Sequence, residues 1–345
     1  MEEENPEASG GPGRRKDSGI SRGGYGTIRP QLHHGQSNPY GDKQILEKAW
    51  PMIKKYAEYL LTHLGMTDKK AAKANPDDAF TYEKGVHLGE WLEPEEFRDQ
   101  VYGAKAKHPE ECTAWLYYSM TIISQIAGLL GRPTAAYDDC AKGSKKAYVH
   151  FVELNTDRQA KLVRPLALGL LEGETKKKTQ QRLKGAVEDY HYRVGTGFLS
   201  TPLLLPVLTE AGEAETAYRM LENTEKPGWL GEVQDGATTI WENWEGDLSQ
   251  NHYSPGAVVQ WLFDTCVGVR MAGENHFVIA PVPGGSLTYA KANYLSPYGN
   301  VESRWEKVNC MTRFTFTVPA NCTAEIRLPE GRTETVNAGR YEYEL

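Results

Sequence analysis

Apolar residues recur at intervals of three and four along most of the first 270 residues, a spacing typical of amphipathic helices. In the first such segment, Pro51 is expected to kink or restart the helix. The apolar stripe there is Ile45, Ala49, Met52, Ile53, Tyr56, Tyr59 and Leu60. The later segments are separated by a few Gly, Asn, Thr or Pro residues, so neighbouring helices should form antiparallel hairpins. The pattern predicts about eight helices, at 45–61, 113–130, 137–152, 157–171, 177–192, 202–210, 213–222 and 254–269.

After Arg270 the pattern changes to an alternation of polar and apolar residues, which is the period of β-strands. Prolines and glycines interrupt this alternation at Pro281, at 283–285, at 297–299 and at Pro319. Such a pattern predicts a small all-β domain, most simply a sandwich. The expected strands are 277–280, 286–294, 300–305, 311–318 and 324–328.

Two regions carry neither pattern. Residues 1–38 are rich in Gly, Ser, Arg and Pro and are expected to be a disordered or unrelated tail. The stretch 67–111 is long and irregular, and loops of that length inside a compact domain usually carry function. We therefore expect a tail at 1–38, a helical domain at 39–271 and a β domain at 272–345.

The overall composition narrows the class of protein. The 345 residues are 39% hydrophobic and 10% aromatic, enough for a sizeable core, and the net charge is −7. An acidic chain lacks the basic face that nonspecific binding to nucleic acid needs, and no long apolar run predicts a membrane span. The five cysteines show no CxxC spacing and the N-terminus has no apolar signal-peptide core, so we expect reduced thiols and a cytoplasmic location.

The densest aromatic and acidic patch lies at residues 236–247, just before the last expected helix. In it Trp241 and Trp244 flank Glu242. An indole face stacks on the apolar face of a sugar ring, and a carboxylate can act as acid, base or nucleophile at the anomeric carbon. The alternative interpretation is a core tryptophan pair with Glu242 as a solvated or capping residue.

Two further groups repeat the theme of carboxylate and ring. Glu90 stands beside Trp91 in the long irregular stretch, and His252 follows Glu242 within the same expected loop. A lone histidine is usually structural, but its place near Glu242 favours a functional role. Other chemistries have no motif here, because GxxxxGK[ST], GxGxxG, HExxH and paired CxxC are all absent. No metal and no cofactor is therefore expected.

The order of these patches resembles that of the bacterial α-L-rhamnosidases of glycoside hydrolase family 78. The resemblance implies an (α/α)6 six-hairpin toroid followed by a small all-β sandwich, and hydrolysis with inversion at the anomeric carbon. The set of matching stretches covers about residues 38 to 345, and GlyAlaThrThrIleTrpGlu is its most specific member. The matching stretches are 38–42, 87–92, 113–119, 196–212, 236–244, 251–258 and 283–299.

The resemblance also assigns roles to residues. Glu242 matches the general base, which activates water on the face opposite the departing oxygen. His252 and Trp91 match positions that contact the rhamnose ring, and Trp244 is expected to help shape the substrate-binding pocket. Glu90, also expected at the substrate, stands where many relatives carry Asp. The expected partners are rhamnose-containing small glycosides or oligosaccharides, with no nucleic acid and no membrane.

Part of the family pattern has no match. The family toroid has twelve helices, and its general acid precedes the stretch that matches 38–42, whereas nothing in residues 1–38 resembles that acidic motif. We therefore expect a toroid incomplete at its N-terminus, with Glu93 as a remote substitute for the acid. Its exposed apolar helix faces would favour a partner such as a homo-oligomer. Two alternatives stay open: a truncated, catalytically inactive carbohydrate-binding remnant, and another (α/α)6 enzyme such as a glycoside phosphorylase or polysaccharide lyase.

Overall fold

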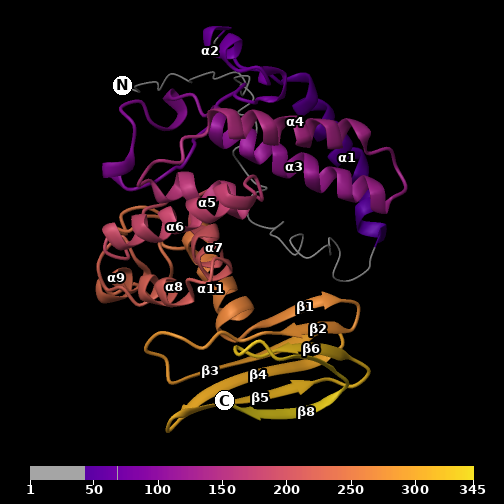
Figure 1. The fold of residues 1–345 in the computed structure, drawn as a ribbon, viewed down its shortest axis with the longest axis vertical. Coiled ribbons are helices and arrows are strands. Elements are labelled where there is room, and N and C mark those ends of the chain that lie inside the picture. Colours follow the sequence, from indigo (N-terminus) through magenta and orange to yellow (C-terminus); the bar gives the residue numbers. More distant parts are fainter. Residues whose placement is uncertain (1–42, 68) are drawn as a thin grey trace, which may run out of the picture.

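The computed structural model describes residues 43–67 and 69–345 (Figure 1). The expected tail at 1–38 and the matching stretch at 38–42 lie outside the described residues. Figure 1 shows a helical domain above a domain of β-strands. The helices are α1 (Lys43–Thr62), α2 (Lys69–Ala74), α3 (Pro109–Leu129), α4 (Ala135–Phe151), α5 (Gln159–Ala167), α6 (Gly173–Asp189), α7 (Thr201–Glu210), α8 (Ala214–Leu221), α9 (Trp229–Gln234), α10 (Tyr253–Gly256) and α11 (Val258–Trp261).

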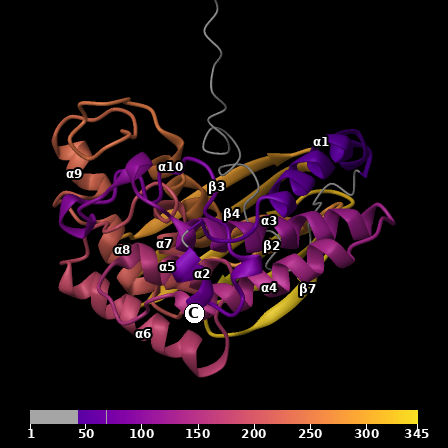
Figure 2. The ribbon, with the colours of Figure 1, turned by 90° about the horizontal axis from the view of Figure 1, so that it is seen from above.

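The longer helices pair as hairpins, as their short connections predicted. α3 packs against α4, α5 against α6, and α7 against α8 (Figures 1 and 2). The irregular region expected at 67–111 is confirmed only in part, because α2 and the start of α3 fall inside it. The stretch between these two helices contains three short 3₁₀ turns and an isolated β-bridge at Tyr82. The helical core is fully buried and mostly aliphatic, with Leu162, Leu183, Leu204 and Met220 among its members.

The buried face of α1 differs from the expected stripe. The helix runs without interruption through Pro51, while Ile45 and Met52 are 63% and 69% exposed. Ile53 and Leu60 of the expected stripe do lie on the packed face, but Trp50 and Ala57, which the stripe did not include, complete it. That face, turned toward α3, is made by Trp50, Ile53, Ala57 and Leu60, again at helical spacing.

The single helix expected at 254–269 is replaced by three short elements. α10 and α11 meet at Ala257, and a π-helical turn covers Leu262–Cys266. Pro255 and Gly256 are poor helix formers, which the apolar periodicity could not register. Because the chain bends there, the rings just before α10 face a cleft described below.

The C-terminal domain is a sandwich of two four-stranded sheets, which confirms the expected all-β architecture (Figure 1). One sheet has the order β1-β2-β6-β7 and the other β3-β4-β5-β8, and β2 pairs with β6 in parallel. Fully buried Phe277, Trp305 and Phe316 belong to its core. The strands are β1 (Val269–Gly273), β2 (His276–Ile279), β3 (Tyr289–Ser296), β4 (Gly299–Val308), β5 (Met311–Val318), β6 (Thr323–Arg327), β7 (Thr333–Val336) and β8 (Gly339–Glu344).

Three of these strands were not predicted. β1 continues almost directly from the π turn, so its start at Val269 precedes the domain boundary expected after residue 271. β7 and β8 lie at the sheet edges and alternate charged with neutral residues rather than polar with apolar ones. Edge strands need little apolar surface, which explains why a hydrophobic pattern missed them.

The two domains are joined by hydrogen bonds to the end of the π turn. The carbonyl of Thr265 accepts from the amide of Val282 at 2.9 Å, and that of Cys266 accepts from Trp305 Nε1 at 2.8 Å. The next carbonyl, of Val267, accepts from Ser303 Oγ at 2.6 Å. The sheet domain therefore supplies donors for carbonyls that a helix end leaves unpaired.

Two expectations from composition can be compared with the structure. All five cysteines are free, as the absence of paired spacing predicted. Among residues 43–67 and 69–345, no helix combines the length and the apolar character that crossing a bilayer requires.

Candidate functional site

Two adjoining cavities lie in the helical domain. The larger, here the main chamber, has a volume of about 550 Å³ and is lined by His252 and by residues of α7, α10 and α11. The smaller, here the side chamber, has a volume of about 100 Å³ and is lined by Trp91 and by residues of α1 and α3. Both chambers are lined by Trp115, Phe198, Leu199 and Tyr253, so they form one continuous aromatic cleft.

The loop before α10 folds back on itself and carries Glu242. The amide of Glu242 donates to the carbonyl of Ser249 at 2.7 Å, and Glu242 Oε2 accepts from the Ser249 amide at 3.3 Å. The amide of His252 donates to the carbonyl of Ile240 at 3.0 Å. Gly246 makes the turn with φ of +78°, and a Cβ there would lie 2.5 Å from the Trp241 ring. This pairing fixes the partly exposed Glu242 on the same loop as His252.

His252 is oriented by its neighbours on both sides. Its Nδ1 accepts from the Ser254 amide at 3.2 Å at the start of α10, and its ring stacks on Phe198 at 4.2 Å between centroids. Burial lowers the pKa of His252, and the opposing charge of Glu242 does not reverse this. The ring is therefore mostly neutral at pH 7, and because Nδ1 accepts, the proton of the neutral ring lies on Nε2.

The two predicted tryptophans occupy different positions. Trp91 lines the side chamber and stacks on Tyr102, with ring centroids 5.7 Å apart and planes 11° from parallel. Trp244 is only 7% exposed, lines neither chamber, and packs edge-on against Trp229. Trp91 is thus available to a ligand in the cleft, whereas Trp244 supports the loop that carries Glu242.

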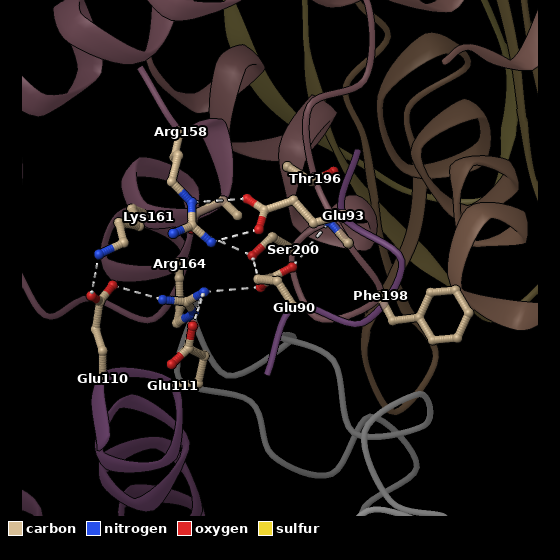
Figure 3. A network of polar contacts seen from close by, with 12 residues as sticks. Glu90, Glu93, Glu110, Glu111, Arg158, Lys161, Arg164, Thr196, Phe198 and Ser200 are labelled. Carbon is tan, nitrogen blue, oxygen red and sulfur yellow. Dashed lines mark hydrogen bonds and ion pairs between the residues drawn. The ribbon is translucent and has the colours of Figure 1, made fainter. Parts of the chain in front are cut away.

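Glu90 is held in a buried ion network, defined here as Glu90, Glu93, Glu110, Glu111, Arg158, Lys161 and Arg164 (Figure 3), which the exposed Asp99 joins at its edge through Arg158. Glu90 is 3% exposed and its Oε1 lies 3.0 Å from Arg164. It also accepts from Ser200 Oγ at 2.5 Å and from the Gly197 amide at 3.1 Å. Both oxygens of Glu90 are thus occupied within the protein.

The network fastens two loops that border the cleft. Glu90 ties the loop of Trp91 to the segment before α7, and the Phe198 amide donates to the Trp91 carbonyl at 2.9 Å. A Cβ on Gly197 would lie 2.6 Å from the Trp91 carbonyl oxygen, so only glycine permits this approach. The structure therefore favours a positioning role for Glu90, with Trp91 and Phe198 as the side chains that it positions.

Glu93 is placed away from both chambers. Its side chain is fully buried and lies 2.6 Å from Arg158. Burial raises the pKa of Glu93 to about 7, against the opposing hydrogen bond from Arg158. Because its side chain is fully buried and both of its oxygens are held by Arg158, Glu93 is not positioned to protonate a departing group in the cleft.

Glu232 anchors the loop of Glu242 from below. It is 2% exposed, its Oε2 accepts from the Trp241 amide at 3.3 Å, and burial raises its pKa to about 7. A carboxyl with a raised folded pKa stabilises the fold fully below its unfolded value of 4.5, and this stability is lost as pH rises to about 7.

Replacing Glu232 by glutamine should remove this loss, because the amide stays neutral. The melting temperature of Glu232→Gln relative to the wild type should therefore rise between pH 4.5 and 7. The difference in unfolding free energy should reach on the order of 3 kcal/mol. Thermal unfolding across that range checks this, with exposed Glu215→Gln as the control. Parallel pH profiles for wild type and Glu232→Gln would contradict it.

Sequence reasoning missed several residues of the site. Phe198 stood in a quoted stretch but was given no role, and Arg164 stood in a predicted helix with nothing to mark it. A charged residue inside an apolar helical run was the available signal, because such a residue must be paired if buried. The acids that pair with Arg164 lie more than 50 positions away in the sequence; for Glu110 the separation is 54. The sequence alone therefore could not show which residues pair with Arg164.

Helical hairpins around an aromatic cleft, followed by a β-sandwich, are the architecture of the six-hairpin glycosidase class. The bacterial α-L-rhamnosidase six-hairpin glycosidase domain matches residues 30–266, and the C-terminal domain of the same enzymes matches residues 270–342. The chain belongs to the bacterial α-L-rhamnosidase six-hairpin glycosidase family.

Individual relatives agree with this family. An α-L-rhamnosidase of Streptomyces avermitilis is 30% identical over 86% of this chain and 28% of its own length. One of Formosa agariphila is 32% identical over 86% of this chain and 33% of its own length. The chain thus spans about a third of the length of these curated relatives.

Solved structures show the same fold. The Streptomyces avermitilis α-L-rhamnosidase complexed with L-rhamnose superposes with a TM-score of 0.75 at 28% identity, over 89% of this chain and 31% of the other. The Aspergillus terreus α-L-rhamnosidase gives 0.76 at 26% identity, over 89% of this chain and 37% of the other. The expected fold class is confirmed.

Proposed function

We propose that this chain hydrolyses terminal α-L-rhamnose from small glycosides or oligosaccharides with inversion, and that Glu242 is the general base. One observation carries the proposal: the loop before α10 is paired so that Glu242 lies close enough to His252 for its charge to act on the ring, and His252 lines the main chamber, although Glu242 itself lines neither chamber. Membership of the rhamnosidase family and the likeness to a relative complexed with L-rhamnose support the choice of sugar.

The proposed mechanism uses the residues as the structure orients them. Glu242 removes a proton from water on the face opposite the departing oxygen, while the new C–O bond forms and the glycosidic bond breaks at an anomeric carbon that carries positive charge. The departing oxygen leaves as an anion and takes its proton from solvent, because no described residue is assigned as its acid. Neutral His252 donates Nε2–H to a sugar hydroxyl, because its Nδ1 is already occupied by the Ser254 amide. Trp91 offers an aromatic face to the ring, and Trp244 and Glu90 hold the surrounding loops in place.

Hydrolysis of 4-nitrophenyl α-L-rhamnoside by this chain tests the proposal. Proton NMR of the first-formed sugar should show β-L-rhamnose, since an inverting enzyme delivers water to the opposite face. A nitrophenolate leaves with little protonation, so the assay is repeated on a rhamnosyl disaccharide. 4-Nitrophenyl α-L-fucoside serves as the control deoxyhexoside and should not be cleaved. The proposed mechanism fails if soluble, folded protein leaves both rhamnosides intact or releases α-L-rhamnose first.

His252 should matter for binding the sugar more than for stability. His252→Asn keeps an oxygen that can accept from the Ser254 amide but does not reach as far as Nε2–H. We expect His252→Asn to melt close to the wild type and to lose about 10-fold in kcat/KM, the worth of one hydrogen bond. His252→Ala should lose stability as well. An unchanged kcat/KM in His252→Asn would contradict a contact with substrate.

The remaining parts of the proposal concern context. The five free cysteines support a cytoplasmic location, because reduced thiols are typical of that compartment. We place the boundary between the catalytic and sandwich domains near the start of β1 at Val269. A homo-oligomer stays a prediction from the expected apolar helix faces.

A further inference from the structure

Glu111 differs from the other acids of the buried ion network. Each of the other three acids has a cation within 3.0 Å, as Glu90 and Glu110 have in Arg164. Glu111 lies 3.5 Å from Arg164 through Oε1 and 3.9 Å from His108 through Oε2. It is also the one acid of the network that lines the side chamber.

His108 does not satisfy Oε2 of Glu111. The Nε2 of His108 lies 2.8 Å from the carbonyl of Gly103, so Nε2 carries the proton. Nδ1 of His108 lies 3.9 Å from Oε2 of Glu111, which is too far for a hydrogen bond. Among the described residues, no side chain therefore donates a close hydrogen bond to Oε2 of Glu111; apart from Arg164, the backbone amide of Glu111 itself stabilises the charged form.

The balance of charge in the network points the same way. Three buried carboxyl groups, of Glu90, Glu110 and Glu111, share the single guanidinium of Arg164, and Lys161 adds a contact to Glu110 alone. Burial would raise the pKa of Glu111, but the charge of Arg164 holds it below its ordinary value, so Glu111 is ionised at neutral pH. An extra buried carboxylate with long contacts adds little to the fold. It is well suited to a ligand that donates hydrogen bonds.

The rest of the side chamber fits such a ligand. Trp91, Trp115 and Phe198 give it aromatic walls. His87 also lines it, and the Nε2 of His87 lies 2.9 Å from the Lys84 carbonyl, which leaves Nδ1 as an acceptor. Aromatic faces together with acceptors suit a sugar, whose C–H faces stack and whose hydroxyls donate.

We infer that Glu111 binds hydroxyl groups of the rhamnose unit, with its Oε2 as the acceptor in the side chamber. The inference deepens the proposed function and rests on it for the identity of the sugar. Arg164 then has a second task beyond holding Glu90, since it steadies Glu111 from behind while the opposite oxygen meets the ligand (Figure 3).

Calorimetric titration with methyl α-L-rhamnoside tests the inference without requiring turnover. Glu111→Gln should bind about 10- to 100-fold more weakly than the wild type, the worth of a hydrogen bond to a charged group. The 2-deoxy, 3-deoxy and 4-deoxy analogues then locate the contact. The analogue that lacks the contacting hydroxyl should bind the wild type more weakly than methyl α-L-rhamnoside does. Its affinities for the wild type and for Glu111→Gln should be almost equal.

Glu110→Gln is the matched control. Glu110 is the preceding residue of the same helix, carries the same charge and contacts Arg164 at 2.9 Å, but lines neither chamber. Glu110→Gln should keep the wild-type preference for methyl α-L-rhamnoside over every deoxy analogue, even if its melting temperature falls. A stability effect alone therefore cannot imitate the expected pattern.

Three outcomes would overturn the inference. Equal affinity of wild type and Glu111→Gln for methyl α-L-rhamnoside would do so, as would a loss of affinity that no deoxy analogue reproduces. A fall in kcat limited to poor leaving groups, with binding unchanged, would make Glu111 a proton donor instead. If the expected pattern of affinities is found but the chain hydrolyses no rhamnoside, the inference about Glu111 stands and the proposed activity is wrong.

Discussion

Glu242→Gln should lower kcat on an aryl α-L-rhamnoside by about 10³-fold, within the range that general-base assistance supplies. Glutamine keeps the shape of the side chain and can still accept from the Ser249 amide, so the loop should stay paired. What it loses is the ability to take a proton from water. KM should change little, because the proposed contacts of His252 and Trp91 with the sugar remain.

Azide separates a base from a merely structural residue. The azide anion attacks without giving up a proton, so it should restore turnover in Glu242→Gln and yield the β-linked rhamnosyl azide. Glu245→Gln, an exposed acid on the same loop, is the control and should turn over like the wild type. The assignment of the base is wrong if Glu242→Gln keeps a tenth or more of the wild-type kcat.

Arg164→Met should be the most destabilising single change of those considered. Arg164 has no exposed surface, and its removal leaves Glu90, Glu110 and Glu111 buried without their shared cation. Breaking a buried pair in this way costs about 3–5 kcal/mol. The melting temperature should therefore fall by about 10 °C in differential scanning calorimetry.

A surface arginine provides the comparison. Arg182 is 38% exposed and pairs with Asp157 near the surface. Arg182→Met should change the unfolding free energy by less than about 1 kcal/mol, since water replaces most of such a pair. If Arg164→Met melts as Arg182→Met does, the network is not what holds the loops of Glu90 and Ser200 together.

The fold could be predicted largely from residue patterns, because hairpin helices and alternating strands each leave a local period. The prediction was wrong for segments in which the residues that pack in the structure are not the ones that the apolar pattern marks. Trp50 and Ala57 of α1 face α3 although the apolar stripe indicated Ile45 and Met52, and β8 pairs at a sheet edge with little apolar content. Tertiary contacts decide such cases, and a single sequence does not contain them.

The sequence predicted those parts of the candidate site whose functional side chains lie close together in the chain. Glu242 and His252 stand on one paired loop, as the sequence suggested, and their roles stay proposals. Trp91 and His252 lie far apart in sequence, and the structure places them in two chambers joined by Phe198. The network behind them could not be foreseen, since its cations and most of its acids come from distant helices and loops.

The hydrogen bonds at the end of the π turn affect when the helical domain can finish folding during synthesis on the ribosome. The carbonyls of Cys266 and Val267 accept hydrogen bonds from Trp305 and Ser303, and these donors are translated almost forty residues later. While the chain is still emerging, the last helical segment can pair its carbonyls only with water. Nascent helical hairpins should therefore stay sensitive to protease until β4 has left the exit tunnel, and become resistant in one step afterwards.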